Sequence, residues 1–321
     1  MPTQFDAAIT LQLDIQRVSA SVQSKAVAIL RKLEKELIGI TIATEWKRAR
    51  VERQLKEARQ AISDYYNKAG TMAAESSGSI AAISAKATTV AIGTAAVLPS
   101  AAMIQSIAGN AVVQGAVQTA WWSKQSTDTA FKYAQAVRQG LVSAETNQQI
   151  VRRVLDVMEI SRANAAALVQ TSVATVANDA RMMVMKANDD IIKRYRAVAT
   201  LDTKTCSQCA PLDGLEWDTQ GKPIGHSVSL PSYPLHYNCR CLLIPRITTE
   251  APGGKRASSG GPVSADLTFE GWLDRQSKAK QIETLGKGRA ELYRSGKITI
   301  SDLTNGNGNP LTISQLEKKY T

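Results

Sequence analysis

Apolar residues recur every three or four positions over residues 11–40, and this periodicity is the strongest constraint on how the chain can fold. Charged residues fill most of the positions between them, so the pattern predicts an amphipathic helix with one apolar face. A second apolar stripe over residues 51–65 predicts another helix, capped by Thr44 and ending near Gly70. We expect the two helices to pair as a hairpin or to dock on a partner.

Residues 87–123 contain no charged side chain. A membrane span needs about 20 mostly apolar residues, so the length would suffice. Amide and hydroxyl side chains recur throughout the stretch, however, and no polybasic flank sets an orientation. We therefore expect a buried helix pair, broken at Pro99, that contacts another subunit. A membrane span and a segment that changes state are the alternatives.

Further helical segments follow as far as Lys186. The first ends near Gly140, Ser143 is the expected cap of the second, and Ser161 is the expected cap of the third. Aromatic residues make up only 5% of the chain, which favours packed helices over a sandwich of strands. The predicted fold is mainly α, with an elongated helical N-terminal part and a small α+β cysteine-rich C-terminal module.

The character of the sequence changes at Arg196, where a strand-like run over 197–201 leads into a loop-rich stretch. In the tail we expect a helix over 272–293, a turn at Gly296 and a hairpin-like turn over 305–308. The predicted divisions are a helical region for assembly contacts (1–125), a second helical part (126–195), a Cys/His module (196–247), a linker or exposed loop (248–266) and a C-terminal tail domain (267–321).

The chain carries 39 lysines and arginines against 28 acidic residues, a net charge of +11. Such a balance favours an anionic partner such as nucleic acid. The basic run over 47–59 is interrupted by glutamates, which is typical of a solvated helix face with intrahelical pairs. No groove-reading motif is present, so any contact with DNA is expected to be nonspecific.

All four cysteines lie in one short part of the chain. The N-terminus lacks the pattern of a signal peptide, so we expect synthesis in a reducing cytosol, where clustered cysteines more often bind metal than form disulfides. The spacing predicts a structural zinc site with four ligands. Five residues compete for the four positions, with Cys241 or His236 as the fourth ligand: Cys206, Cys209, His236, Cys239 and Cys241. His226 is a weaker candidate, and disulfides or plain burial of the thiols are the alternatives.

Three motifs occur in a fixed order: TLDTKTCSQC at 200–209, LDG at 212–214 and PLHYNCRC at 234–241. Together they resemble the signature of the phage minor head protein family, the phage Mu F-like head-morphogenesis proteins. The resemblance covers about residues 134–247 and 269–316. It implies a low-copy virion protein at the portal vertex or inner head wall, acting in head assembly or DNA delivery.

The implied partners are the portal protein, the major capsid protein or a second copy of the chain, with packaged DNA as a nonspecific contact. The family has no settled catalytic activity, so we do not expect an enzyme. One alternative is an internal ejection protein that contacts membrane or DNA. Another is a metal-dependent nuclease that uses the acidic residues Asp202, Asp213, Glu216 and Asp218. The competing interpretation is that Asp213 and Gly214 form a turn and Asp202 caps a loop.

Overall fold

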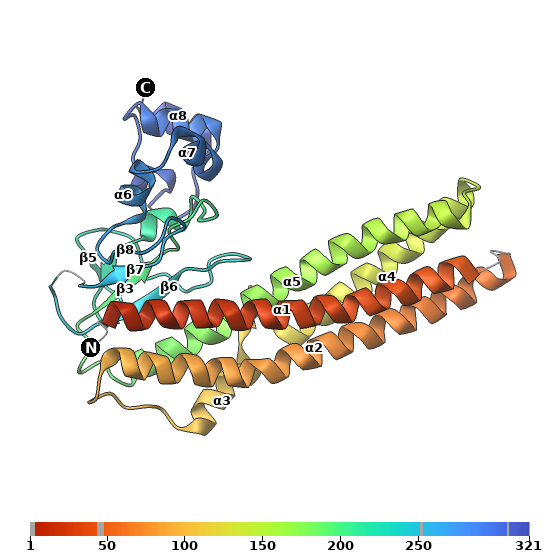
Figure 1. The fold of residues 1–321 in the computed structure, drawn as a ribbon, viewed down its shortest axis with the longest axis horizontal. Coiled ribbons are helices and arrows are strands. Elements are labelled where there is room, and N and C mark those ends of the chain that lie inside the picture. The colour runs from red at the N-terminus through yellow and green to blue at the C-terminus, as the bar shows by residue number, and fades with distance from the viewer. Residues whose placement is uncertain (1–3, 44–47, 251–252, 307, 321) are drawn as a thin grey trace.

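Four long helices form the body of the molecule. The computed structural model describes residues 4–43, 48–250, 253–306 and 308–320. The four helices are α1 (Gln4–Ala43), α2 (Arg48–Ile92), α4 (Gln118–Val142) and α5 (Asn147–Lys186). They run side by side along the long axis, as two hairpins that pack on each other (Figure 1). The prediction of a mainly α fold with an elongated helical part is confirmed.

The apolar stripes of the helices meet in one core. Leu30, Leu33 and Leu37 of α1 are fully buried, in agreement with the predicted amphipathic pattern. A chain of buried hydroxyl groups crosses the same core. The Tyr66 hydroxyl lies 2.8 Å from Thr129 Oγ1, which in turn lies 3.0 Å from Ser161 Oγ. Because buried polar groups need their partners, these bonds fix how α2, α4 and α5 align.

Three predictions about helix ends are wrong. Helix α2 continues through Gly70 to Ile92. The glycine allows the Trp122 ring to pack closely against the helix, since a Cβ at this position would lie 3.2 Å from the ring. Ser161 lies within α5 and donates to the Val157 carbonyl at 2.8 Å. The cap of α5 is Thr146, in a reciprocal pair with Gln149, and Ser143 instead ends α4. Thr44 lies outside the described residues.

The uncharged stretch over 87–123 contains more than the expected helix pair: α2 packs against a short helix, and a hairpin follows. It holds the end of α2, the short helix α3 (Ala101–Asn110) and a hairpin of β1 (Val112–Val113) and β2 (Ala116–Val117) before α4 begins. The predicted break at Pro99 is confirmed, since Ser100 caps α3. None of the helices in the described ranges is both long enough and apolar enough to cross a membrane.

A small antiparallel sheet packs at one end of the helical body. Its strand order is β5-β4-β3-β6, with β3 (Arg194–Val198) between β4 (Glu216–Trp217) and β6 (Leu242–Arg246), and β5 (Pro223–Ile224) at one edge. Strand β3 therefore starts three residues before the strand predicted over 197–201. Tyr195 and Trp217 of the sheet are buried in the same core as the long helices. The α+β cysteine-rich module is thus continuous with the helical body.

A second core lies beyond the sheet. Helices α6 (Phe269–Asp274), α7 (Lys278–Leu285), α8 (Lys287–Arg294) and α9 (Ile313–Tyr320) pack around Phe269, Trp272 and Leu273, together with Leu201 of the module. The single helix predicted over 272–293 is broken, because Ser277 caps α7 and Gly286 adopts a positive φ of 76°. The turn at Gly296 is confirmed by its φ of 70°, and Asn307 of the predicted hairpin-like turn lies outside the described residues.

Where the sequence predicted a linker or exposed loop, part of the chain is ordered. Strands β7 (Lys255–Arg256) and β8 (Val263–Ser264) form a hairpin, and the side chain of Arg256 is only 2% exposed. The glycines and serines of this segment favour a loop, but they do not indicate that Arg256 has a buried partner elsewhere in the chain. That partner is Asp213 of the cysteine-rich module.

Candidate metal centre

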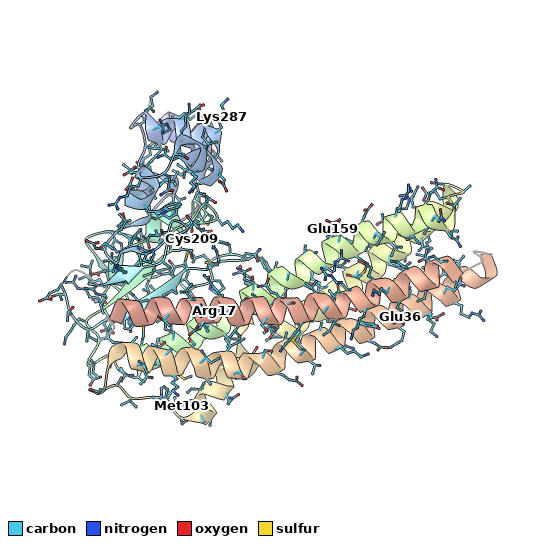
Figure 2. All side chains as sticks on the ribbon, in the orientation of Figure 1. Arg17, Glu36, Met103, Glu159, Cys209 and Lys287 are labelled. Atoms are coloured by element: carbon cyan, nitrogen blue, oxygen red, sulfur yellow. The ribbon has the colours of Figure 1, made fainter. Side chains whose placement is uncertain are left out.

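Two tight turns bring the four cysteines together at the base of the C-terminal helices, where Figure 2 labels Cys209. In the first turn, the backbone N–H of Cys209 donates to the carbonyl of Cys206 at 3.1 Å. In the second, the N–H of Cys239 donates to the carbonyl of His236 at 3.2 Å. Asn238 in this turn has a φ of 61°, a conformation that asparagine tolerates better than most residues. Both turns therefore aim their side chains at one point.

Helix α5 positions the second turn. The backbone N–H of Asn238 donates to Thr171 Oγ1 at 3.1 Å, and the same hydroxyl donates to the Ala167 carbonyl at 2.7 Å. Thr171 is fully buried. The hydroxyl thus uses both its donor and an acceptor site, which couples the position of the cysteine turn to the helical body. Sequence reasoning assigned no role to Thr171, because a threonine within a helix carries no local signal of such a contact.

The donor atoms form two overlapping groups of three that share Cys209. In the first, Nε2 of His236 lies 3.1 Å from Cys206 Sγ and 3.2 Å from Cys209 Sγ. In the second, Cys209 Sγ lies 3.7 Å from Cys239 Sγ, with Cys241 completing the group. None of the four cysteines is in a disulfide. The structure therefore brings together all five predicted ligand candidates.

Charge within the cluster is shared between thiols and imidazole. The hydrogen bond from Cys209, aided by His236, lowers the pKa of Cys206 to about 4. Hydrogen bonding to Cys206 raises the pKa of His236 to about 11. Hydrogen bonds from Cys209 and Cys241 also hold the pKa of Cys239 well below its usual value. The thiolate, which is the form of cysteine that binds metal, is thus favoured at Cys206 and Cys239. Hydrogen bonding to Cys206 and Cys239 instead raises the pKa of Cys209, and the hydrogen bond to Cys239 together with burial raises the pKa of Cys241.

One pair of sulfur atoms in the cluster is spaced as on a tetrahedral ion. With metal–sulfur bonds of about 2.3 Å, two thiolates on one tetrahedral zinc lie about 3.8 Å apart, close to the 3.7 Å between Cys209 and Cys239. Nδ1 of His236 lies 2.8 Å from the Tyr237 carbonyl and donates to it, which leaves Nε2 facing the sulfurs. A metal ion would replace the proton that Nε2 shares with the thiolates. The cluster can hold a soft metal ion.

His226 lies apart from the cluster. Its Nε2 donates to the Glu216 carbonyl at 2.9 Å, its Nδ1 accepts from the Val228 N–H at 3.2 Å, and its ring meets Trp217 edge-on at 4.9 Å. Both ring nitrogens are therefore engaged within the sheet. This histidine supports the fold of the module, and the weaker candidate of the sequence analysis is not brought to the cysteines.

The acidic residues considered for a nuclease occupy separate interactions. Asp202 pairs with Arg240 at 2.7 Å and caps the loop at Lys204, as the structural interpretation predicted. Glu216 pairs with Arg194 at 2.9 Å, and Asp218 accepts two backbone N–H groups in its own turn. Within the described parts of the chain, the only groups of three or more potential metal ligands are the two that contain the cysteines.

Asp213, the fourth of these acidic residues, forms a buried ion pair that joins three segments. Its Oδ1 and Oδ2 each accept from Arg256 at 3.0 Å, with both side chains at most 2% exposed. The same carboxylate accepts from the backbone N–H of Ala199 and of Phe269, both at 2.7 Å. The expected turn is present, with Gly214 at a φ of 88°. We call this set of bonds the Asp213 clasp.

Residues 132–244 match the family model described as Phage Mu protein F like protein. The chain carries a Phage Mu F-like domain. The matched segment starts within α4 and ends within β6, so the F-like domain contains α5 and all five candidate ligands. The resemblance inferred from the three motifs is confirmed over this segment. Searches of curated proteins and of solved structures gave no match.

The match covers residues 132–244 of the 321 residues of the chain. Helices α1, α2 and α3 and the second core around Trp272 lie outside the matched residues. They nevertheless pack against the F-like domain: α1 and α2 share the core of α5, and the Asp213 clasp ties the second core to the module. The parts outside the F-like domain are therefore held in fixed positions relative to it.

Proposed function

We propose that the chain is a minor head protein of a phage. It is present in few copies at the portal vertex or inner head wall, where it acts in head assembly or in delivery of the packaged DNA. The observation that carries this proposal is the match of the F-like domain over 132–244. The long helical body supports it, because an elongated shape suits a protein that bridges neighbouring head components (Figure 1).

The surface around α3 is the proposed contact with the portal or major capsid protein. It lies within the uncharged stretch and exposes large apolar side chains: Val90, Val97, Leu98, Met103, Val112 and Val117. Val90 is 66% exposed and Met103 is 52% exposed. Exposed apolar side chains within one uncharged stretch of the chain favour a protein partner over water. A second copy of the chain is the alternative occupant.

Introducing two charges on this surface should keep the protein out of heads. We expect Leu98→Glu/Met103→Glu to lower the amount in purified heads by about tenfold or more, because two buried carboxylates would oppose an apolar contact. Val142→Glu, at an 83% exposed position near the opposite end of the body, is the matched control. Quantitative immunoblots of heads from complemented infections make the measurement.

Equal incorporation of the double variant and the control would refute the α3 surface as the contact. Substitutions are preferable to deleting the stretch, because Ile104 and Val113 belong to the core of the body. A deletion would therefore disturb the fold as well as the surface. Circular dichroism of both purified variants checks that their helices are intact.

We further propose that the metal is one structural zinc ion. Three ligands are Cys206, Cys209 and Cys239, and the fourth is His236 or Cys241. Thiolate and imidazole donors suit zinc, and a closed set of four leaves no position for a reactive water. The 3.7 Å separation of two sulfurs and the fixed orientation of the imidazole support this assignment. The ion would hold the two turns of the F-like domain together.

Contact with packaged DNA, as a further part of the proposal, is electrostatic and nonspecific. The net charge of +11 would meet phosphates at high local concentration inside a filled head, and neutralised phosphates release counterions. Apparent affinity should therefore fall steeply with salt and be the same for unrelated sequences. Gel-shift titrations with two unrelated duplexes at two salt concentrations measure this. A sequence preference, or an affinity that ignores salt, would contradict the expectation.

A further inference from the structure

A cleft lies between α1, α5 and the second cysteine turn. Its volume is about 230 Å³. Helix α1 contributes Ser19 and Gln23 to the lining, α5 contributes Gln170, Asn178 and Arg181, and the turn contributes residues 239–241. Among the residues that the structure describes, no aspartate or glutamate lines the cleft. The walls therefore offer amides, a hydroxyl and the guanidinium groups of Arg181 and Arg240, beside the thiols of Cys239 and Cys241 and several apolar side chains.

Arg181 is the unusual residue of this cleft. It is only 3% exposed, and its Nη1 donates to Asn178 Oδ1 at 2.6 Å. In the described part of the chain no carboxylate pairs with it, and burial alone lowers its pKa to about 10. Arg256, which is equally buried, is by contrast fully paired with Asp213. A buried charge without a counter-charge is costly, so a protein that keeps one has a use for it.

The lining selects the chemistry of the ligand. A guanidinium binds a carboxylate through two parallel hydrogen bonds, and amide groups such as those of Gln23 and Gln170 can donate to the same oxygens. A cleft of this volume admits a side chain but no nucleic acid duplex, whose phosphates are bound by exposed basic surfaces. The apolar walls from Val173 and Ala177 suit the methylene groups of an acidic side chain.

We propose that this cleft binds the carboxylate of an acidic side chain presented by a peptide segment of a partner protein. The inference deepens the proposed function, on which it rests for the source of the peptide, a neighbouring head component. The binding itself is a property of the purified chain. It can therefore be measured without heads, and its failure is distinguishable from a failure of incorporation at the α3 surface.

The test measures binding of labelled hexaglutamate and hexaglutamine to the purified full-length protein by fluorescence anisotropy at physiological salt. We expect hexaglutamate to bind and hexaglutamine to bind at least about tenfold more weakly, since charged hydrogen bonds carry the interaction. Arg181→Met should weaken hexaglutamate binding by a similar factor. Arg17→Met removes an exposed arginine of α1, one of the helices that line the cleft, and should leave hexaglutamate binding unchanged.

Two variants of Ala20 test the same binding if Arg181→Met does not fold. Ala20 lines the cleft at an exposed position, so Ala20→Trp should block entry and abolish binding, whereas Ala20→Ser should preserve it. Thermal unfolding adds a separate readout: Arg181→Met should match or exceed the wild-type melting temperature, because it removes an uncompensated buried charge. The proposal would be overturned if the two peptides bound equally, or if Arg181→Met and Ala20→Trp bound hexaglutamate as the wild type does. A large fall in the melting temperature of Arg181→Met, or DNA binding that requires Arg181, would also overturn it.

Discussion

The Cys209→Ser variant should purify without metal, whereas the wild-type chain should carry close to one zinc ion per molecule. Cys209 is the donor shared by both groups of the cluster, so its loss leaves His236 and Cys206 separated from Cys239 and Cys241. Zinc binding in small structural sites is worth about 10–16 kcal/mol, and this binding energy is also folding energy. Replacing this one sulfur atom with oxygen is therefore expected to lower stability more than most other single substitutions in the chain.

Elemental analysis of protein made in the cytosol measures the metal, and limited proteolysis measures its consequence. We expect new cleavage within residues 200–247 of Cys209→Ser, while circular dichroism still reports the long helices, whose far ends lie away from the cluster (Figure 1). A strong chelator should produce the same cleavage in the wild-type chain. His226→Gln is the control for metal content, because this histidine lies in the same module but outside the cluster. Wild-type protein free of any soft metal would rule the assignment out.

Asp213→Asn should destabilise the protein by about 3–5 kcal/mol, because it leaves the buried guanidinium of Arg256 without its counter-charge. The substitution keeps the size of the side chain, so the loss reports charge and hydrogen bonding more than packing. Asp213 also receives the N–H of Phe269, the first residue of α6. The second core around Trp272 should therefore separate from the module at lower denaturant concentration.

Urea unfolding followed by tryptophan fluorescence measures this loss. Asp14→Asn is the control, since Asp14 pairs with Arg17 on the surface and exposed pairs contribute at most about 1 kcal/mol. The double variant Asp213→Asn/Arg256→Met should lose less than the sum of the two single variants, because no unpaired charge remains. Equal stabilities of Asp213→Asn and Asp14→Asn would show that the Asp213 clasp does not hold the segments together.

Much of the helical body could be predicted because its signal is local. The stripe over 11–40 repeats with the period of a helix, and α1 follows it. The ends of helices were less predictable, because they depend on neighbours. Gly70 is a helix stop in sequence terms, but in the structure it makes room for the Trp122 ring. Serine is a common helix cap, but the hydroxyl of Ser161 instead completes a buried chain of hydroxyl groups with Thr129.

The candidate site shows the same division. Cysteine and histidine spacing indicated the five donors, because few residue types bind soft metals and two tight turns can place them together. The supporting contacts had no such signal. Arg256 lies among glycines and serines, and Thr171 and Arg181 lie within a helix whose pattern is otherwise ordinary. Arg256 and Thr171 owe their roles to partners far away in the sequence, and Arg181 owes its role to a cleft that α1 and a distant turn complete. Periodicity and composition do not report such contacts.

Quantitative mass spectrometry of purified heads, from the phage that encodes this chain, tests directly whether the chain is a minor head protein. A minor head protein should be present in every preparation, at a small fraction of the copy number of the major capsid protein, and should stay with the particle through gradient purification. Absence of the chain from purified heads, with the protein abundant in the lysate of the same infected cells, would contradict its role as a minor head protein.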